Sequence, residues 1–385
     1  MEHKDFDVVV IGAGMAGASA AAEIARTCRV VLLERESQPG YHSTGRSAAL
    51  FSETYGNAVV RALTRASRNF FYTPPDGFAE HSLVRTRGSL HIARNDQIAA
   101  LKAFFALPDV AANARLVDAK EARRLCPLLR DGYAAAAILE PDAADVDVHA
   151  LHQGYLRQFR TRGGVLITDA GVTALQRTPA NWFVRTTAGE FGAPIVVNAA
   201  GAWADGVAAI AGLGPLGITP NRRTALLVDP PPGIEVDSLP NTIDVEEQFY
   251  FKPDAGKLFL SPADETPSLP CDAQPDEIDV AVAIDRVQRA ADIDVRHVRR
   301  KWAGLRSFAP DRSPVIGYDE RAKGFFWLAG QGGYGIQTAP AAGLLASALV
   351  SEGRVPELLA ALGVEEAPLS PSRFMGRPYR EAAAR

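Results

Sequence analysis

The chain has 385 residues, enough for two or three units of ordinary domain size that each bury a core of their own. Its 41 basic and 45 acidic residues give a net charge of −4 and form no long block of either sign. Because a nucleic-acid-binding protein normally carries a basic stripe, no nucleic-acid partner is expected. The three cysteines are far apart and lack metal-binding or redox spacing, which is typical of free thiols in a reducing compartment. We therefore expect a cytoplasmic protein, free or held against the inner face of the membrane.

The first residues predict a strand, a helix and a second strand. Asp7–Ile11 and Val30–Leu33 are short apolar runs rich in valine and leucine, which are typical of buried parallel strands. Met15–Arg26 lies between them and is rich in alanine, so a helix there can lie close to a sheet. Two further buried strands are expected at Ile195–Asn198 and Phe325–Ala329. The strands of one sheet are thus dispersed through the chain.

The segments between these strands show a different pattern. Residues 82–95 and 222–262 alternate more regularly and contain the turn residues expected of antiparallel strands. They predict a second, mixed domain inserted into the first. No apolar run approaches the roughly 18 to 20 residues of a membrane-spanning helix, so no membrane span is expected.

A glycine motif directly follows the first predicted strand. Gly12, Gly14 and Gly17 open the predicted helix, and Glu34 stands 17 residues further on, at the end of the second strand. The first glycine permits a tight turn, the second lets the backbone approach a pyrophosphate, and the third allows close helix packing. Backbone amides and the helix dipole favour the phosphates, and Glu34 can accept hydrogen bonds from ribose hydroxyls. The motif predicts a dinucleotide site.

Two further segments distinguish FAD from NAD. Gly40–Ala49 (GYHSTGRSAA) offers hydroxyl groups, an arginine and small residues, which suit phosphates and the inner face of a large ring. Gly330–Gln337 (GQGGYGIQ) has few side chains, so its backbone can press against a flat cofactor. The helix that follows can stabilise negative charge on a reduced flavin. An NAD-dependent dehydrogenase leaves both segments unexplained, so FAD is the expected cofactor.

Over almost its whole length the chain resembles the FAD-dependent amine and D-amino acid oxidoreductases of the D-amino acid oxidase and glycine oxidase family. Within that family it resembles the bacterial D-arginine dehydrogenases most closely. The segments that carry the resemblance are Pro39–Ala49, Ala150–Arg157 (ALHQGYLR), Val197–Trp203 (VNAAGAW), Phe249–Gly256 (FYFKPDAG), Trp302–Phe308 (WAGLRSF) and Gln331–Thr338 (QGGYGIQT).

The resemblance implies an α/β fold with a Rossmann-type FAD-binding domain. Into it is inserted an α+β substrate domain built on a mixed, largely antiparallel sheet. The expected FAD-binding domain comprises residues 1–84, 148–218 and 304–385, and the substrate domain comprises residues 85–147 and 219–303. FAD would lie extended, with the substrate between the flavin ring and the second sheet.

Noncovalent binding of FAD is expected. No cysteine lies near Gly332, where related flavins are attached, and His42 is the alternative attachment point. The predicted FAD-binding residues are Gly12, Gly14, Met15, Ala16, Gly17, Glu34, Arg35, His42, Ser43, Thr44, Arg46, Ser47, Ala48, Val172, Ala200, Gly201, Trp203, Arg306, Gly330, Gln331, Gly332, Gly333, Tyr334, Gly335, Ile336 and Gln337.

The reaction implied by the resemblance is oxidation of a D-amino acid. A hydride moves from Cα to flavin N5, and the imino acid hydrolyses to a 2-oxo acid and ammonia. Arginines and tyrosines hold the α-carboxylate in that family, and the matching residues are Tyr55, Arg222, Tyr250 and Arg306. A planar guanidinium can bind a carboxylate through two parallel hydrogen bonds. Tyr55, the carbonyl group of Gly333 or a water molecule can assist loss of the amine proton, and the sequence leaves this choice open.

Two alternative functions stay open at this point. One is a FAD-dependent oxidase of a secondary amine or a glycine-type substrate. The other is a flavin-bearing RNA-modification protein, against which the acidic balance and the absence of a basic arm weigh.

Two departures from the D-arginine dehydrogenase pattern concern the substrate side chain. Those relatives carry a glutamate and a histidine where this chain has Ser89 and Leu50. A cation buried without such partners loses its hydration and gains little. No strict preference for D-arginine is therefore expected, and Glu53, on the same loop as Leu50, is a candidate replacement partner.

The electron acceptor is expected to be a quinone or a dye-like molecule rather than oxygen. Sarcosine-type oxidases place a lysine over the flavin, and the matching position is Leu258, with Lys257 facing away. Superoxide formed there would gain little stabilisation without a cation.

The segment DVDVHALH contains Asp145, Asp147, His149 and His152 and could be mistaken for a metal site. Asp147 instead suits the N-cap of a helix that runs through Arg160, and the resembling family binds no metal there. No metal is expected.

Overall fold

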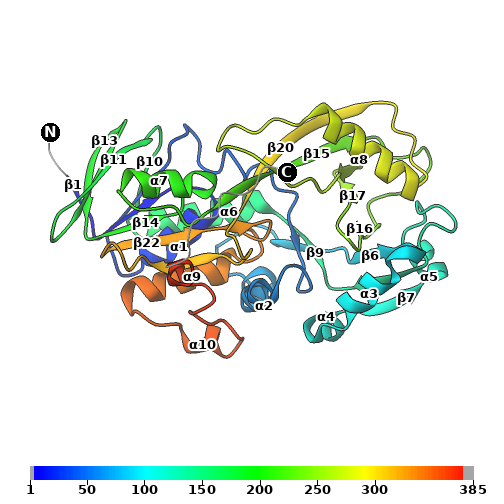
Figure 1. The fold of residues 1–385 in the computed structure, drawn as a ribbon, viewed down its shortest axis with the longest axis horizontal. Helices are drawn as coiled ribbons and strands as arrows, with labels where there is room; N and C mark the ends of the chain where they lie inside the picture. Colours follow the sequence, from blue (N-terminus) through cyan, green and yellow to red (C-terminus); the bar gives the residue numbers. More distant parts are fainter. Residues whose placement is uncertain (1–3, 376–385) are drawn as a thin grey trace.

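The computed structural model describes residues 4–375, which form four β-sheets with helices packed on them (Figure 1). The ends of the predicted FAD-binding domain, residues 1–3 and 376–385, lie outside the described residues. Two sheets are large, with six and ten strands. The six-stranded sheet occupies the left half of Figure 1, and most of the ten-stranded sheet lies on the right.

The six-stranded sheet contains all four buried runs that the sequence predicts. Its strands pair in parallel except at one edge, where β21 is antiparallel to β22. In spatial order the strands are β10 (Val165–Ile167), β3 (Val30–Leu33), β2 (Val8–Ile11), β14 (Ile195–Asn198), β22 (Phe325–Ala329) and β21 (Val315–Tyr318). Segments far apart in the chain are therefore neighbours in one sheet.

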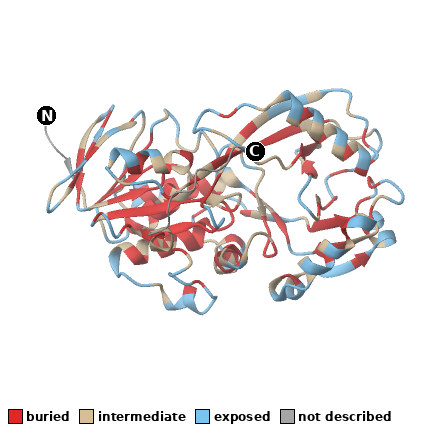
Figure 2. Cartoon of the chain, in the orientation of Figure 1, coloured by how far each residue is buried: buried red, intermediate tan, exposed pale blue. Residues whose placement is uncertain are grey.

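Both faces of this sheet are covered, which is why its strands read as continuous apolar runs. One face packs against α1 (Met15–Ile24), α6 (Val148–Thr161) and α9 (Ala339–Ser351), and Figure 2 shows how many buried residues gather there. The other face packs against α7 (Ala204–Ile210) and a four-stranded sheet of β1 (Lys4–Asp5), β13 (Gly189–Ala193), β12 (Trp182–Thr186) and β11 (Val172–Arg177).

The ten-stranded sheet is mixed and largely antiparallel, as predicted. Within the described residues, only its β6–β16 pair is parallel. The strands in spatial order are β23 (Gln331–Gly332), β20 (Val298–Phe308), β15 (Thr219–Val228), β18 (Lys257–Ser261), β17 (Tyr250–Asp254), β16 (Asn241–Asp244), β6 (Ser89–Ala93), β8 (Ala136–Glu140) and β7 (Arg115–Asp118), with β19 (Thr266–Pro267) beside β15.

Two features of this sheet bear on the predicted domain limits. β20 runs on through residue 304, so the boundary expected there falls inside a strand. One face of the sheet is apolar and packs against α5 (Ala119–Leu125) and α8 (Glu277–Ala290). At β6 and β8 the other face packs against the apolar side of the helix Ile98–Phe105.

The remaining elements connect the two large sheets or cover their edges. They are β4 (Leu50–Phe51), β9 (Ala144–Val146) and β5 (Val84–Thr86), which form a three-stranded sheet, and the helices α2 (Ala58–Tyr72), α3 (Ile98–Phe105), α4 (Pro108–Asn113) and α10 (Glu357–Ala360). None of the helices within residues 4–375 has the length and apolarity needed to cross a bilayer.

His91 of β6 is a buried titratable group away from the glycine motif. Its ring lies against Phe104 of α3, with 5.1 Å between the ring centroids, and its Nε2 atom has no hydrogen-bond partner among the described residues. Burial lowers the pKa of His91 from 6.5 to about 4. The folded protein therefore holds this imidazole neutral.

This burial predicts a pH-dependent stability. Between pH 6.5 and about 4 the unfolded chain binds a proton on His91 and the folded chain does not, so stability falls as the pH falls through this range. The loss attributable to His91 reaches about 3 kcal/mol at the acid end. His91→Leu should flatten the dependence of the apparent Tm on pH, measured by thermal unfolding from pH 7 to 4. His297→Gln, which changes an exposed histidine, should leave the dependence unchanged; equal behaviour of both variants contradicts the assignment.

Candidate active site

A cavity of about 720 Å³ is lined by residues of both large sheets. At one end lies the glycine motif. Gly12 has a φ of +99°, and a Cβ atom there would lie 2.6 Å from the carbonyl oxygen of Ala199. A Cβ atom on Gly17 would lie 1.8 Å from the carbonyl oxygen of Gly12. These distances require glycine at both positions, as the motif predicts.

The start of α1 meets the segment 40–48 at the same end. The backbone amide of Met15 donates to Thr44 Oγ1 at 2.9 Å, so Thr44 stands at the helix N-terminus, where a phosphate is favoured. His152 of α6 supports the loop from behind, because its Nε2 atom lies 2.9 Å from the carbonyl oxygen of Ala13. This contact and the N-cap bond of Asp147 to the Ala150 amide, at 2.8 Å, give both residues structural tasks.

Glu34 is 6% exposed, and burial raises its pKa. Its Oε2 atom accepts a hydrogen bond from the Ala13 amide at 2.9 Å, and its Oε1 atom accepts one from the Glu36 amide at 3.0 Å. A carboxylate has about four lone-pair sites, so acceptor capacity remains for ribose hydroxyls. Glu34 therefore shapes the glycine loop and is placed to bind a ribose.

The segment 40–48 is fixed to the second sheet. Ser43 Oγ donates to the Leu305 carbonyl at 2.6 Å. The Arg46 guanidinium donates to the carbonyls of Ala273 and Ala303, at 2.9 and 3.0 Å, and forms an ion pair with Asp272. Arg46 thus supports the cavity wall and does not offer a free guanidinium to a phosphate, which corrects the role suggested by the sequence.

His42 also lines the cavity, at the same wall. Its Nε2 atom lies 2.9 Å from Glu36 Oε1, and its ring centroid lies 4.7 Å from that of Trp203. Arg35 lies over the same Trp203 ring, with its guanidinium carbon 4.7 Å from the ring centroid. His42 is thus engaged by Glu36, and noncovalent binding of FAD stays the expectation.

The second glycine segment lies at the opposite end. Gly332 has a φ of +53°, and a Cβ atom there would lie 2.2 Å from the Phe308 ring. A Cβ atom on Gly333 would lie 2.8 Å from Nη1 of Arg306. The wall here is therefore bare backbone, which suits a flat ring.

Most of the residues predicted to bind FAD line the cavity. Those that do not are Gly17, Gly330, Tyr334 and Gln337, and among the predicted substrate-binding residues Tyr55 and Arg222 do not line it either. Tyr334 stands one layer behind, with its ring centroid 4.8 Å from that of Tyr55. Gln337 bridges the Ser52 amide, at 3.2 Å, and Thr64 Oγ1, at 2.8 Å.

Arg306 lines the cavity beside Gly333, and Tyr55 lies next to it without lining the cavity. Arg306 Nη1 donates to the Tyr55 hydroxyl at 3.1 Å. Arg306 is partly exposed, and that exposure lies in the cavity it lines. Burial lowers the pKa of Arg306, but Tyr55, Tyr250 and Glu247 together raise it, so its guanidinium stays charged.

Arg222 is not where the sequence analysis expects it, and its neighbour Arg223 takes its place. Arg222 Nη2 donates to Asp279 of α8 at 2.7 Å, on the helix-covered face of the sheet. Arg223 lines the cavity, and its Nη2 atom donates to Glu265 at 3.1 Å. Successive residues of a strand face opposite sides, so only one of the two arginines can face the cavity. Acidic residues in the first turn of α8 are the sequence signal that could have identified Arg222 as the arginine that faces this helix.

Phe259, not Leu258, faces the cavity from β18. Leu258 is fully buried in the core beneath α8, whereas the Phe259 ring stacks on Tyr250 with centroids 5.6 Å apart. Lys257 pairs with Asp229 at 2.7 Å and does not line the cavity. The expectation about the electron acceptor stays a prediction.

The two tyrosines differ in acidity because their neighbours differ. Burial raises the pKa of Tyr55, and the charge of Arg306 only partly offsets it. Burial would also raise the pKa of Tyr250, but Arg306 and Arg223 together outweigh it and lower that pKa. Two guanidinium groups thus converge on Tyr250.

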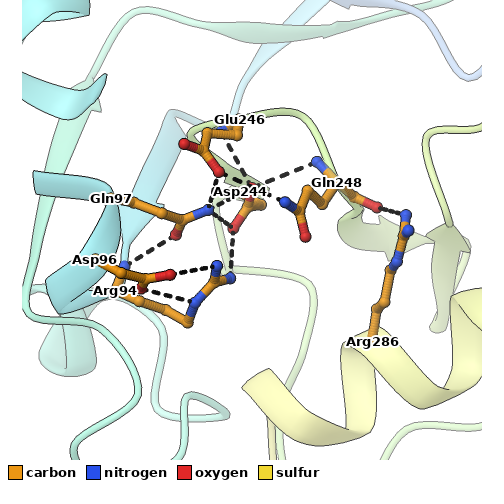
Figure 3. Close-up of polar contacts among 7 residues, drawn as sticks. All are labelled: Arg94, Asp96, Gln97, Asp244, Glu246, Gln248 and Arg286. Carbon is orange, nitrogen blue, oxygen red and sulfur yellow. Dashed lines mark hydrogen bonds and ion pairs between the residues drawn. The ribbon is translucent and has the colours of Figure 1, made fainter. Parts of the chain in front are cut away.

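A buried network fixes the turn before Tyr250 (Figure 3). Asp244 is fully buried, and its Oδ1 atom accepts hydrogen bonds from the Glu246 amide at 3.0 Å and from Gln97 Nε2 at 3.1 Å. Arg94 reaches Asp244 Oδ2 at 3.4 Å. The turn holds Glu247, exposed and with a φ of +54°, close enough to Arg306 to affect its pKa.

Ser89 and Leu50 do not line the cavity, and the acid directly opposite Ser89 in the sheet, Glu140, is engaged by residues 52–54. Ser89 is fully buried and accepts from Asn241 Nδ2 at 3.3 Å. Glu53 is buried, pairs with Arg68 at 2.5 Å and does not line the cavity. Glu53 is therefore not the replacement partner that the sequence analysis considered.

Polar atoms without partners support the fit of a cofactor and substrate in this cavity. Arg223 Nε, Ser307 Oγ and Gln331 Nε2 are buried and have no hydrogen-bond partner among the described residues, and all three residues line the cavity. A buried donor left alone is costly, so these atoms point to a molecule that binds here. Within residues 4–375 no group of three or more His, Cys, Asp or Glu side chains is placed to hold a metal.

A parallel sheet with a glycine loop at its edge, joined to a second sheet across a long cavity, defines a dinucleotide-dependent oxidoreductase of the flavin type. A family model described as FAD dependent oxidoreductase (DAO) matches residues 7–349. The chain belongs to this family, and its cofactor is FAD.

Individual relatives agree with this assignment. The glycine oxidase of Geobacillus kaustophilus (strain HTA426) is 24% identical over 392 aligned residues, which cover 98% of this chain and 99% of that protein. The crystal structure of glycine oxidase from the same species has a TM-score of 0.84 at 23% identity and covers 97% of this chain and 100% of its own. L-proline dehydrogenase from P. horikoshii has a TM-score of 0.83 at 23% identity, covering 97% and 98%. They share the fold, and the narrower likeness to D-arginine dehydrogenases stays a prediction.

The contact between Gly333 and Arg306 makes a prediction. In Gly333→Ala the new methyl group meets the Arg306 guanidinium at 2.8 Å, and the arginine must move because its end is the flexible partner. Substrate carboxylate binding should weaken by about tenfold, the effect of one distorted charge-assisted hydrogen bond. Bound FAD, measured by absorbance after release, should be unchanged. Loss of FAD with normal substrate affinity contradicts this assignment.

Proposed function

We propose that the protein oxidises a D-amino acid to its imino acid, which water then hydrolyses to a 2-oxo acid and ammonia. FAD supplies the hydride acceptor when it is bound. The residues of this chain bind the α-carboxylate, orient the Cα–H bond toward the flavin-binding wall and exclude water.

One observation carries the proposal. Arg306 is a cation at the inner end of the cavity, and no carboxylate within residues 4–375 forms an ion pair with it; its hydrogen-bond partner is the Tyr55 hydroxyl. A guanidinium held inside a protein without an acid is costly unless an anion arrives. Arg223 adds a second guanidinium with an unpartnered Nε atom. Both favour a substrate carboxylate.

Binding of the α-carboxylate alone does not determine which stereoisomer of the substrate reacts. The relatives include a glycine oxidase and, among solved structures, an L-proline dehydrogenase and an L-amino acid deaminase from Proteus vulgaris. A secondary amine or glycine-type substrate is therefore the second candidate. Bleaching of the flavin absorbance under anaerobic conditions by D-amino acids, and not by their L-forms, glycine or proline, would support the first candidate over the second.

The two cavity-facing arginines make a matched prediction. Arg306→Lys and Arg223→Lys keep the charge and remove the planar guanidinium. The loss of transition-state stabilisation, calculated from kcat/KM, should be about 2 kcal/mol or more in each variant. FAD content should be unchanged. Arg222→Lys is the control, because Arg222 pairs with Asp279 behind the sheet, and its kcat/KM should stay near the wild-type value. A large effect in the control and none in the other two would contradict this arrangement.

Selectivity for the substrate side chain makes a second prediction. Ser89 and Leu50 offer no charge to a distal guanidinium, so D-arginine and D-lysine should lose their advantage over D-methionine, D-leucine or D-phenylalanine. Ser89→Glu should partly restore it. The measurement is kcat/KM for a panel of D-amino acids with both proteins.

The same panel of substrates shows whether another acidic residue binds a cationic substrate side chain. A wild-type preference for D-arginine of more than about tenfold, or some 1.4 kcal/mol, contradicts the predicted selectivity. Glu247 is then the acid to test, since its carboxylate lies within electrostatic reach of Arg306 and Tyr55. Glu247→Gln should in that case remove the preference.

A further inference from the structure

Glu140, the last residue of β8, is a buried carboxylate that the proposed reaction does not use. It is 2% exposed. Its oxygens accept hydrogen bonds from three consecutive residues: Ser52 Oγ at 2.6 Å, the Glu53 amide at 2.7 Å and Thr54 Oγ1 at 2.7 Å. No lysine, arginine or histidine of the described chain forms an ion pair with it. Its hydrogen-bond partners among the described residues are all uncharged groups.

Burying a carboxyl group without a cationic partner costs free energy, and the geometry shows which segment the buried group stabilises. Burial raises the pKa of Glu140, and the three hydrogen bonds oppose this by stabilising the charged form. An ionised carboxylate only accepts, so three donors can converge on it at once, whereas an amide has a single acceptor oxygen. The convergence fixes both the backbone and the side chains of residues 52–54.

The fixed segment leads directly to Tyr55. Thr54 is its preceding neighbour, and the Tyr55 hydroxyl accepts the hydrogen bond from Arg306 at 3.1 Å. Glu140 and Arg306 stand on β8 and β20 of the same ten-stranded sheet, whereas Tyr55 belongs to the connection between β4 and α2. Glu140 therefore ties this connection to the sheet that carries Arg306.

We propose that Glu140 is a positioning residue for substrate binding, which holds residues 52–54 so that Tyr55 meets Arg306 at the carboxylate site. The inference rests on the proposed function, in which Arg306 receives the substrate carboxylate, and Tyr55 is the hydrogen-bond partner of Arg306. Glu140 touches neither substrate nor cofactor, and it acts through Tyr55.

The first test needs no substrate. Glu140→Gln is compared with Glu53→Gln, which changes the neighbouring carboxylate, whose ion-pair partner among the described residues is Arg68. Hydrogen–deuterium exchange is measured on both FAD-loaded proteins. Peptides covering residues 50–57 should exchange at least about fivefold faster in Glu140→Gln and at the wild-type rate in Glu53→Gln. Unchanged exchange in Glu140→Gln overturns the inference.

The second test measures binding and its dependence on Tyr55. Benzoate, a carboxylate that cannot be oxidised at Cα, is titrated against the flavin absorbance of each holoprotein. Its Kd should rise about tenfold in Glu140→Gln, as expected for one or two lost hydrogen bonds, with FAD content unchanged. In a double-mutant cycle, Glu140→Gln combined with Tyr55→Phe should bind no more weakly than Tyr55→Phe alone. Additive weakening overturns the inference.

The outcomes separate this inference from the proposed function. Absence of benzoate binding to the wild type contradicts the carboxylate site itself. Normal wild-type binding with an unchanged Kd in Glu140→Gln contradicts the role of Glu140 alone. If Glu140→Gln does not fold, Ser52→Ala removes one of the three hydrogen bonds and is subjected to both measurements, with smaller changes in the same directions expected.

Discussion

The pairing of β15 with β20 is the constraint on which the reaction end of the cavity depends. Their register places Asn221 opposite Arg306 and Arg223 opposite Gly304. Residues directly opposite each other share a face, so both guanidinium groups point into the cavity. A slip of one residue would turn Arg222 inward and Arg223 toward α8. The direction in which both guanidinium groups point thus depends on a long pairing of two strands.

The charges at this end are arranged to receive an anion. Arg223 shares Glu265 with Arg312, whereas Arg306 forms no ion pair within residues 4–375 and interacts with Tyr55, Tyr250 and, at longer range, Glu247 and Glu265. The positive field that results lowers the pKa of Tyr250, while Tyr55 keeps the raised pKa of a buried phenol. A carboxylate that binds here neutralises the field, and the two phenols remain as hydrogen-bond donors of unequal strength. The bound anion and the polar wall therefore stabilise one another.

Local patterns were sufficient to predict some of this structure and insufficient for the rest. The glycine motif, the buried runs and the N-cap Asp147 each depend on a few consecutive residues, and the structure confirms the strands and the cap. The choice between Arg222 and Arg223 depends on the phase of a strand, which two adjacent arginines do not reveal. The boundary expected at residue 304 falls inside β20, which runs without a break from residue 298 to residue 308.

Two residues that the sequence did not point to, Glu140 and Asp244, have the same structural role. Glu140 holds the segment before Tyr55, and Asp244 holds the turn before Tyr250, each as a buried acceptor for donors on a segment that no regular element would otherwise fix. All the donors to Glu140 and one donor to Asp244, Gln97, come from residues far away in the chain, so neither carboxylate stands out by spacing. A flexible connection cannot place a phenol within hydrogen-bond distance of a substrate by itself. A buried carboxylate supplies the missing rigidity, because it accepts several donors at once and is too costly to leave without them.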